Sequence, residues 1–340
     1  MSLNLVRALI LFGAFALSLL SANAKTLDGI AIESAQFLGA QPDDSDVDAL
    51  VVKTQILLDR AGFSPGEIDG KLGENVKKAL RAYSEANGLS STMTLNHDVF
   101  ERLTANMNGA LLVEITVTED DVEGPFLPRQ PKGLDEMKGL ERLAYRNAKE
   151  ALAERHHMSE ALLAALNPHA EFSRAGATLM VANVLKAKPS TVVTRIEVNK
   201  DLQTIKAFSG DNALVAFYPA TVGSEEKPSP SGTLKVFAVR SNPFYRYNPD
   251  YKFKGVRARR AFTINPGPNN PVGSTWIALS ERGYGIHGTS EPSKVSKAES
   301  NGCVRLTNWD AAHLARMVKK GVTVEFREGT DSQVNARPAK

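Results

Sequence analysis

Cysteine is almost absent from this chain, which holds only Cys303 among its 340 residues. One cysteine cannot form an internal disulfide, so a fold held together by disulfides is excluded. Zinc sites of the Cys-x-x-Cys or His-x-x-x-His type are excluded too, because neither spacing occurs in the sequence. We therefore expect no metal ion and no cofactor.

The chain also lacks an excess of charge of either sign. Its 41 Lys and Arg against 38 Asp and Glu give a formal net charge of +3. A nucleic-acid-binding protein usually carries a stronger excess or a dense basic stripe. The nearest feature, VRARR at Val256–Arg260, is short and contains no aromatic residue. We interpret it as a solvated loop and expect no nucleic acid partner.

No apolar run near the N-terminus is long enough to cross a membrane. The run Ala8–Leu20 has 13 residues, whereas a spanning helix needs about 20. Arg7 precedes it, and the small-x-small sequence Ala22-Asn23-Ala24 follows it. This is the pattern of a cleaved signal peptide. We predict that residues 1–24 are removed on export, leaving a periplasmic protein with no stable membrane span.

Export makes a functional reason for the single cysteine easier to argue. In an oxidising compartment an unpaired thiol is exposed to oxidation, and a nucleophile is one reason to keep it. A buried structural cysteine is the alternative. His287 lies sixteen residues upstream of Cys303, and an imidazole can accept a thiol proton. The spacing alone leaves packing and catalysis both open.

What the sequence does contain is the composition of a soluble protein with several domains. Hydrophobic residues make up 42% and charged residues 23% of the chain. We expect a linker over residues 25–45 and a small helical domain over residues 46–106. Its first helix starts near Asp46 and carries apolar residues at three- and four-residue spacing: Val47, Leu50, Val51, Leu57 and Leu58.

Two further helices complete this small domain. The second runs from about Glu74 to Asn87, and the third lies within LSSTMTLNHDVFERL. Between the first two lies AGFSPGEIDGKLG, whose glycines predict a tight turn. QILLDRAGFSPGEIDGKLGENVKKALRAYSEANGL resembles the peptidoglycan-binding domain in which two helices flank a Gly-x-Ile-Asp-Gly-x-x-Gly turn, on the strength of Ile68, Asp69, Gly70 and Gly73. The resemblance implies binding to cell-wall polymer.

Residues 107–193 predict a mixed connector. A strand over Leu111–Thr118 precedes a proline-rich stretch and two short helices, the second capped by Ser159 and stopped at Asn167-Pro168. ATLMVAN predicts a closing strand. The helix–helix–strand order resembles a degenerate LysM module without its usual opening strand and Gly-Asp-Thr turn. The adjacent His156 and His157 cannot share one helix face, so we interpret them as helix-end histidines rather than zinc ligands.

Residues 194–328 predict a mostly-β domain. Short alternating runs are bounded by Gly, Pro and Asn, and one helix interrupts them from Asn308 to about Lys320. We expect Asn308 to cap that helix and Gly321 to stop it. The polar residues 329–340 predict a disordered tail.

The residues around Cys303 are those that a nucleophilic site needs. Gly302 lets a substrate backbone approach closely, and the amides of Gly302 and Cys303 can stabilise an oxyanion. Arg305 is a bidentate carboxylate binder by its geometry. The helix that begins at Asn308 adds the positive end of its dipole.

The whole string YGIHGTSEPSKVSKAESNGCVRL resembles the active-site signature of the YkuD family of L,D-transpeptidases. The matching residues are Tyr284, Gly285, His287, Gly288, Thr289, Ser300, Gly302, Cys303 and Arg305. PSPSGTLKV and GPNNPVGSTWIAL resemble two further ordered segments of that family. The resemblance implies a β-sandwich with one helix that forms a thioester between cysteine and a peptidoglycan tetrapeptide stem. D-Alanine leaves, and an amine from another stem or a protein lysine resolves the thioester.

The resemblance also assigns roles to individual residues. Cys303 is the nucleophile, His287 the general base, and the carbonyl of Gly288 orients the imidazole. Gly302 and Cys303 supply oxyanion amides. The donor-stem pocket is lined by Tyr284, Ser300 and Arg305. Many members carry a second histidine two positions before the cysteine, where this chain has Asn301.

Other chemistries stay open or are disfavoured. Water in place of the amine makes the same site a carboxypeptidase or endopeptidase, and a non-catalytic wall-binding protein is a further alternative. A serine D,D-peptidase needs Ser-x-x-Lys at a helix start. The only such string, Ser224–Lys227, lies in a charged loop without an accompanying Lys-Thr-Gly.

Overall fold

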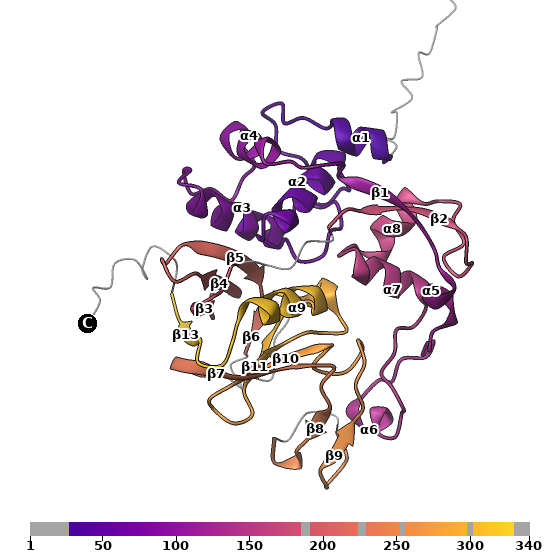
Figure 1. Cartoon of the computed structure of the whole chain (residues 1–340), viewed down its shortest axis with the longest axis vertical. Helices are drawn as coiled ribbons and strands as arrows, with labels where there is room; N and C mark the ends of the chain where they lie inside the picture. The colour runs from indigo at the N-terminus through magenta and orange to yellow at the C-terminus, as the bar shows by residue number, and fades with distance from the viewer. Residues whose placement is uncertain (1–26, 185–190, 224–228, 252–255, 298–301, 330–340) are drawn as a thin grey trace, which may run out of the picture.

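The computed structural model describes residues 27–184, 191–223, 229–251, 256–297 and 302–329. The predicted signal peptide, the predicted tail beyond residue 329 and the Ser224–Lys227 string lie outside these ranges. Among the described residues, no helix combines the length and apolar character needed to cross a membrane. Figure 1 shows a helical part at the top, a connector at the right and a β-rich part below.

The helical part contains the three helices that the sequence predicts. They are α2 (Ala49–Arg60), α3 (Glu74–Ala86) and α4 (His97–Ala105). Asp48 and Asn96 cap the first and the last of them, because their side chains accept hydrogen bonds from the amides of Leu50 and Val99. The expectation for Val47 is wrong: it precedes α2 and is 46% exposed.

The expected linker over residues 25–45 is wrong in part, because it contains the helix α1 (Gly29–Ser34). Ile32 of this helix is fully buried in the core of the helical part. The Nζ of Lys53 donates to the carbonyls of Glu33 and Ala35 at 2.8 and 2.9 Å. The short helix is therefore held by contacts with distant residues, which its own sequence does not reveal.

The glycine-rich turn packs closely against α2. Gly70 has φ +77°, and a Cβ on it would lie 2.7 Å from the Cγ1 of Val47. The Gly70 amide donates to Gln55 Oε1 at 2.8 Å, and Gln55 Nε2 donates to Asp69 Oδ1 at 2.8 Å. The turn thus requires glycine for both its conformation and its fit.

The connector has the order strand, helices, strand. It consists of β1 (Leu112–Thr116), α5 (Glu119–Glu123), α6 (Leu134–Met137), α7 (Ala148–Arg155), α8 (Glu160–Leu166) and β2 (Thr178–Ala182). β1 and β2 pair antiparallel, with Glu114 opposite Met180. The predicted strand over Leu111–Thr118 is present as β1, and the predicted closing strand in ATLMVAN is present as β2.

The connector and the helical part share one hydrophobic core. Leu152 and Leu179 of the connector belong to the same buried cluster as Ile56 and Leu80 of the helical part. The predicted caps hold, since the Ser159 hydroxyl accepts from the amide of Leu162 and α8 ends at Asn167. Because the core is shared, we expect these two parts to unfold together.

The β-rich part is built around one sheet of nine strands in the order β5-β4-β3-β13-β7-β10-β11-β12-β6. The strands are β3 (Arg195–Asn199), β4 (Thr204–Phe208), β5 (Leu214–Pro219), β6 (Thr221–Val222), β7 (Gly232–Ser241), β10 (Thr275–Leu279), β11 (Gly285–His287), β12 (Val304–Arg305) and β13 (Thr323–Arg327). β8 (Tyr245–Tyr247) and β9 (Phe262–Ile264) form a separate pair. The short 3-10 helices η1 (Pro249–Tyr251) and η2 (Pro292–Lys294) lie in the loops.

The sheet closes around a second core. Tyr218 and Val222, from the two outermost strands of the sheet, lie in the same buried cluster, so the sheet curls back on itself. The helix α9 (Asn308–Met317) packs against β10 and β11 (Figure 1). The predicted mostly-β fold with one α-helix is confirmed for the described residues.

The predicted cap of α9 is wrong. The side chain of Thr307, not Asn308, accepts the hydrogen bond from the amide of Asp310, and the helix ends at Met317 rather than near Lys320. Both threonine and asparagine occur as helix caps, so residue type alone does not decide between these neighbours. The side chain of Asn308 instead makes its hydrogen bonds with distant residues.

The helical part is fixed to the edge of the sheet through β5. The Ser64 amide donates to the carbonyl of Phe217 at 2.9 Å, and the Phe217 amide donates to the carbonyl of Gly62 at 3.0 Å. The Phe217 side chain is 1% exposed and belongs to the helical core rather than to the core of its own sheet. One side chain of the β-rich part therefore completes the core of the helical part and the connector.

We predict that Phe217→Ala destabilises the protein by about 3–5 kcal/mol, because it leaves a cavity in a core shared between modules. Urea unfolding followed by tryptophan fluorescence measures the change. Phe237→Ala is the matched control, since Phe237 is 58% exposed and its loss should change the free energy of unfolding by only about 0.5 kcal/mol or less. Equal effects of the two substitutions would contradict the shared core.

Candidate active site

Two short parallel strands bring together three of the residues predicted from the sequence. In the pairing of β11 with β12, Ile286 lies opposite Val304 and His287 opposite Arg305. Ile286 and Val304 point into the core, where they are 0% and 1% exposed. Because successive side chains of a strand alternate between its faces, His287, Arg305 and the preceding Cys303 project from the opposite face.

The hydrogen bond of His287 determines its tautomer. Its Nδ1 lies 2.6 Å from the carbonyl oxygen of Gly288. A carbonyl oxygen can only accept, so Nδ1 carries the hydrogen and Nε2 keeps a free lone pair. The predicted contact between Gly288 and the imidazole is therefore present, and it leaves Nε2 as the basic nitrogen.

The surroundings of His287 keep its imidazole neutral. The side chain is 4% exposed. Burial, together with the charge of Arg305, lowers the pKa of His287 from 6.5 to about 3, although the bond to Gly288 acts in the opposite direction. At neutral pH the ring is therefore in the form that a general base requires.

Trp276 of β10 fixes the plane of this imidazole from the other side. It is paired with His287 in the sheet, and the two rings stack with centroids 5.6 Å apart and planes 21° apart. A Cβ on Gly285 would lie 2.5 Å from the Trp276 ring, so only glycine leaves room for it. The sequence pattern does not single out Trp276, although its alternation with the buried Ile277 indicates which face it occupies.

Cys303 is half-buried and reaches the loop before β11. Its Sγ lies 3.5 Å from the carbonyl oxygen of Gly283. Burial raises the pKa of the Cys303 thiol, while the Gly285 amide and the charge of Arg305 oppose that rise. The resting cysteine is therefore a thiol rather than a thiolate, and it needs a base to become nucleophilic.

The residues beside Cys303 are held in place from the core side. Gly302 has φ +96°, a conformation that favours glycine. Its carbonyl accepts a hydrogen bond of 2.7 Å from the buried hydroxyl of Ser229, a residue that the sequence pattern does not single out. The Nε of Arg305 is buried and makes no hydrogen bond to any described residue. Arg305 thus has one buried donor that no described residue uses.

Tyr284 is the remaining predicted site residue that the structure describes. The Tyr284 side chain is half-buried against the core of the β-rich part. Ser300 and Asn301 lie outside the described residues.

A cavity of about 430 Å³ lies elsewhere, between α9, the connector and the helical part. None of the predicted site residues lines this cavity, so the candidate active site is separate from it.

Two family profiles match this chain. Residues 193–326 match YkuD, described as an L,D-transpeptidase catalytic domain, and residues 48–103 match PG_binding_1, described as a peptidoglycan binding domain. A Bacillus licheniformis protein named as L,D-transpeptidase YkuD is 30% identical over 152 residues, which cover 45% of this chain and 75% of that protein. The chain belongs to the YkuD family of L,D-transpeptidases.

Further relatives of this L,D-transpeptidase carry similar names. Bacillus subtilis YkuD is 31% identical over 175 residues, which cover 51% of this chain and 90% of that protein. A solved L,D-transpeptidase structure from Xylanimonas cellulosilytica is 14% identical with a TM-score of 0.35, and the match covers 86% of this chain and 100% of that chain.

We predict that Gly285→Ala destabilises the transpeptidase by about 1–3 kcal/mol, because its new methyl group displaces Trp276. Urea unfolding measures the change. Gly210→Ala is the control, since its Cβ would come no closer than 3.8 Å to Thr194. A Gly285→Ala protein as stable as this control, with unchanged tryptophan fluorescence, would show that the stack does not restrain the site.

We predict that the His287 imidazole of the transpeptidase stays neutral and protonated at Nδ1 from pH 9 to pH 5, because burial lowers its pKa to about 3. Two-dimensional ¹⁵N NMR of the ring, assigned with His287→Gln, measures this.

The same shift has a stability consequence with a defined sign. The folded pKa lies below the ordinary value of about 6.5, so His287 supports folding above that pH and loses the contribution as the pH falls towards 3. A His287 ring that becomes protonated between pH 8 and 6 would contradict both statements.

Proposed function

We propose that this L,D-transpeptidase is an exported cysteine acyltransferase that acts on tetrapeptide stems of peptidoglycan. One observation carries the proposal: the Gly288 carbonyl holds His287 with a free Nε2 on the sheet face from which Cys303 projects. A buried neutral imidazole beside a thiol on the same face is the arrangement that nucleophilic catalysis by cysteine requires.

The first half of the reaction follows from these two groups. Nε2 of His287 takes the Sγ proton, and the sulfur forms a bond to the carbonyl carbon between meso-diaminopimelate and D-alanine. The amides of Gly302 and Cys303 stabilise the resulting oxyanion. The carbon–nitrogen bond then breaks, the His287 proton passes to the leaving amine, and D-alanine departs from a thioester.

In the second half an amine resolves the thioester. The amine of another stem, or a protein lysine, forms a bond to the thioester carbon and gives its proton to His287. The carbon–sulfur bond breaks, and the sulfur regains that proton. Water in place of the amine makes the same steps a hydrolysis, so the acceptor decides between transpeptidase and carboxypeptidase products.

Arg305 fits the role of a carboxylate ligand in this scheme. Its Nε makes no hydrogen bond to the described residues, and its charge favours the thiolate of Cys303. The same charge disfavours the imidazolium of His287. We infer that Arg305 pairs with a stem carboxylate and so positions the stem beside Cys303. Tyr284 and Ser300 complete the proposed donor pocket.

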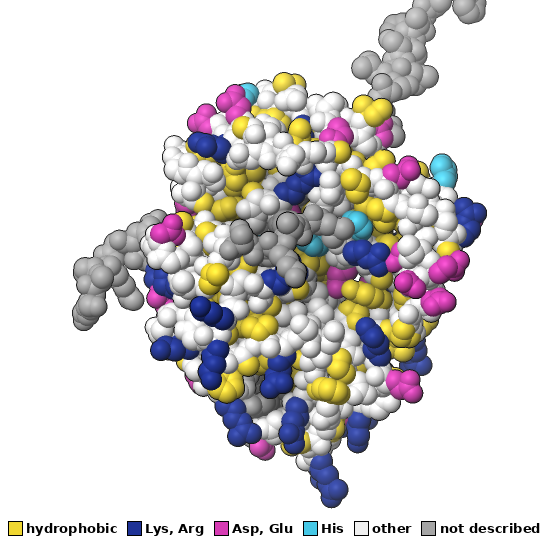
Figure 2. Space-filling model, in the orientation of Figure 1, with side chains coloured by type: hydrophobic (Ala, Val, Ile, Leu, Met, Phe, Trp, Pro, Cys, Tyr) yellow, Lys and Arg dark blue, Asp and Glu magenta, His cyan; other side chains and the backbone are white. Residues whose placement is uncertain are grey.

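The surface around the catalytic part suits a carboxylate-bearing polymer. The described residues 232–251 and 256–262 contain six Lys and Arg and one Asp. Figure 2 shows basic side chains gathered over the β-rich half on the visible face, whereas acidic ones lie mainly on the upper and right parts. Peptide stems carry free carboxylates, so this half can attract them over distances of about 10 Å at moderate ionic strength.

The peptidoglycan-binding domain supports the same conclusion, because it places the catalytic part on its polymer. We propose a periplasmic location after removal of residues 1–24, with peptidoglycan as the partner and no metal or other cofactor in the reaction. Tethering to the wall raises the local concentration of stems near Cys303.

We predict that the purified protein incubated with a tetrapeptide muropeptide forms a covalent adduct at Cys303 and releases D-alanine, as measured by mass spectrometry. Cys303→Ala should give no adduct. His287→Gln should acylate at least about 100-fold more slowly, since a positioned general base typically contributes 10²–10⁴-fold. His313→Gln, which removes a histidine bonded to Tyr218 instead, should retain the activity.

The products separate the remaining possibilities. Cross-linked dimers together with D-alanine support transpeptidation. D-Alanine without dimers, in the presence of acceptor stems, supports hydrolysis by the same cysteine. An intact wild-type protein that yields neither adduct nor D-alanine would overturn the enzymatic proposal.

A further inference from the structure

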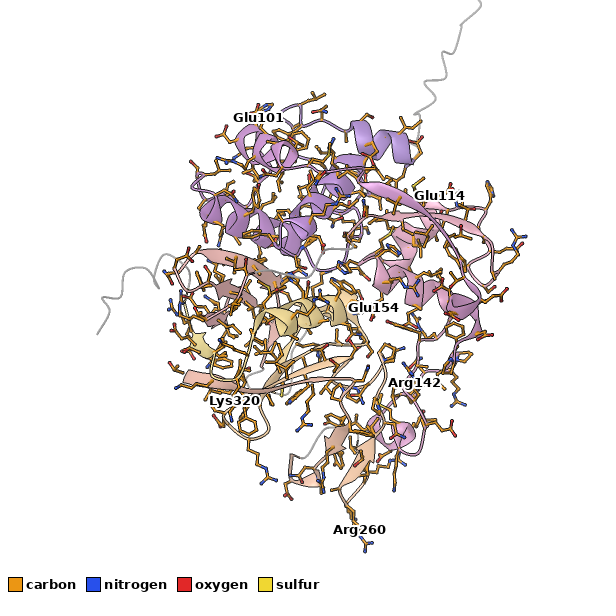
Figure 3. All side chains as sticks on the ribbon, viewed as in Figure 1. Glu101, Glu114, Arg142, Glu154, Arg260 and Lys320 are labelled. Carbon is orange, nitrogen blue, oxygen red and sulfur yellow. The ribbon has the colours of Figure 1, made fainter. Side chains whose placement is uncertain are left out.

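Glu154 belongs to the connector, yet its carboxyl group makes a hydrogen bond with the catalytic part. It lies on α7 beside α9 (Figure 3). Its Oε1 accepts a hydrogen bond of 2.9 Å from the hydroxyl of Tyr145 and another of 2.9 Å from Nδ2 of Asn308. The first partner lies in the connector, and the second is the first residue of α9. Glu154 therefore joins two parts of the chain that are 154 residues apart.

Asn308 is fixed at both ends of its amide group. Its Oδ1 accepts from the amide of Ser274 at 3.0 Å, and its Nδ2 donates to the carbonyl of Pro268 at 3.1 Å as well as to Glu154. The side chain is 4% exposed. These three partners define which end of the amide carries oxygen and which carries nitrogen, so the group has one orientation.

The oxygen end of Asn308 lies directly against the backbone of Gly288. A Cβ on Gly288 would lie 2.1 Å from Asn308 Oδ1, and a Cβ on Gly273 would lie at the same distance from that oxygen. Both positions therefore require glycine, because any side chain there would overlap the amide oxygen of Asn308. The position of the Gly288 peptide therefore depends on where Asn308 is held.

Gly288 is also the residue whose carbonyl holds Nδ1 of His287. The contacts thus run without a gap from Glu154 to Asn308, from Asn308 to Gly288 and from Gly288 to His287. We propose that Glu154 is a positioning residue for His287, acting through Asn308 and the Gly288 backbone. As a positioning role for a general base, this inference rests on the function proposed above.

The chemistry of Glu154 offers a conservative replacement. Removal from water, together with the charges of Glu150 and Glu67, raises the pKa of Glu154 to about 7. Near neutral pH the carboxyl group is thus partly protonated, and a glutamine oxygen can accept the same two hydrogen bonds. Glu154→Gln keeps the contacts with Tyr145 and Asn308, whereas Glu154→Ala removes both.

A second bond between modules provides a matched control. The hydroxyl of Ser64, in the helical part, donates to Oδ2 of Asp310 at 2.8 Å. Asp310 lies on the same helix two residues after Asn308, but none of its hydrogen bonds leads to Gly288. Ser64→Ala therefore removes a hydrogen bond to α9 while leaving the path to His287 intact.

The experiment uses the full chain and three readouts. They are the ¹H resonance of His287 Nδ1–H, the rate constant for alkylation of Cys303 by iodoacetamide, and the rate of D-alanine release. We expect Glu154→Ala to shift or broaden the resonance and to slow both rates about 3- to 30-fold, with KM unchanged. Glu154→Gln should stay within about twofold of the wild type, and so should Ser64→Ala.

A double-substitution cycle tests whether Glu154 acts through Asn308. If it does, adding Asn308→Ala to Glu154→Ala should slow alkylation no further than Asn308→Ala alone. Independent effects that multiply would overturn the proposed path. So would a folded Glu154→Gln protein that is as slow as Glu154→Ala, or a Glu154→Ala protein no slower than Ser64→Ala.

The readouts also separate this inference from the function on which it rests. Alkylation and NMR need no wall substrate. Wild-type protein that releases no D-alanine, but whose Nδ1–H and alkylation rate respond to Glu154→Ala, would overturn the proposed function and support the positioning role. D-Alanine release that is equal in both proteins would overturn the positioning role alone.

Discussion

The catalytic face depends on the register of two very short strands. β11 and β12 pair in parallel through only two residue pairs, and this pairing sends Ile286 and Val304 inward and His287 and Arg305 outward. A slip of one residue would reverse every side chain of one strand. The buried pair is what prevents the slip, because moving Val304 out of the core costs about 1.5–3 kcal/mol. Apolar packing thus holds a polar site together.

The site also shows how burial restrains reactive groups until a substrate arrives. Low solvent exposure keeps the imidazole of His287 and the thiol of Cys303 neutral, so the resting site carries Arg305 as its charge. Neutral groups avoid the desolvation cost of an ion pair and leave the thiol less open to oxidation. In the proposed mechanism, Cys303 therefore rests as a protected thiol until His287 takes its proton.

Much of this arrangement can be read from the sequence because it is local. Ser159 lies three residues from the amide that it caps, and the residues from Tyr284 to Arg305 form one continuous string in the sequence. What the sequence hides are contacts between distant segments. Helix α1, the pairing of β1 with β2 and the stack of Trp276 on His287 depend on neighbours that no local pattern names. Asparagine is a residue type that favours helix caps, but the Asn308 side chain makes a tertiary hydrogen bond with Glu154 instead.

The burial of the Phe217 side chain in the core of the helical part has a consequence for solubility. β5 is an outermost strand of the sheet, and such strands present unpaired backbone groups to other chains. Here residues 62–64 take up both backbone groups of Phe217, and the phenyl ring is covered at the same time. The helical part, which matches a peptidoglycan-binding domain, thus also covers the edge strand of the sheet. Removal of the helical part would expose β5 at the surface of the enzyme, free to pair with a strand of another chain.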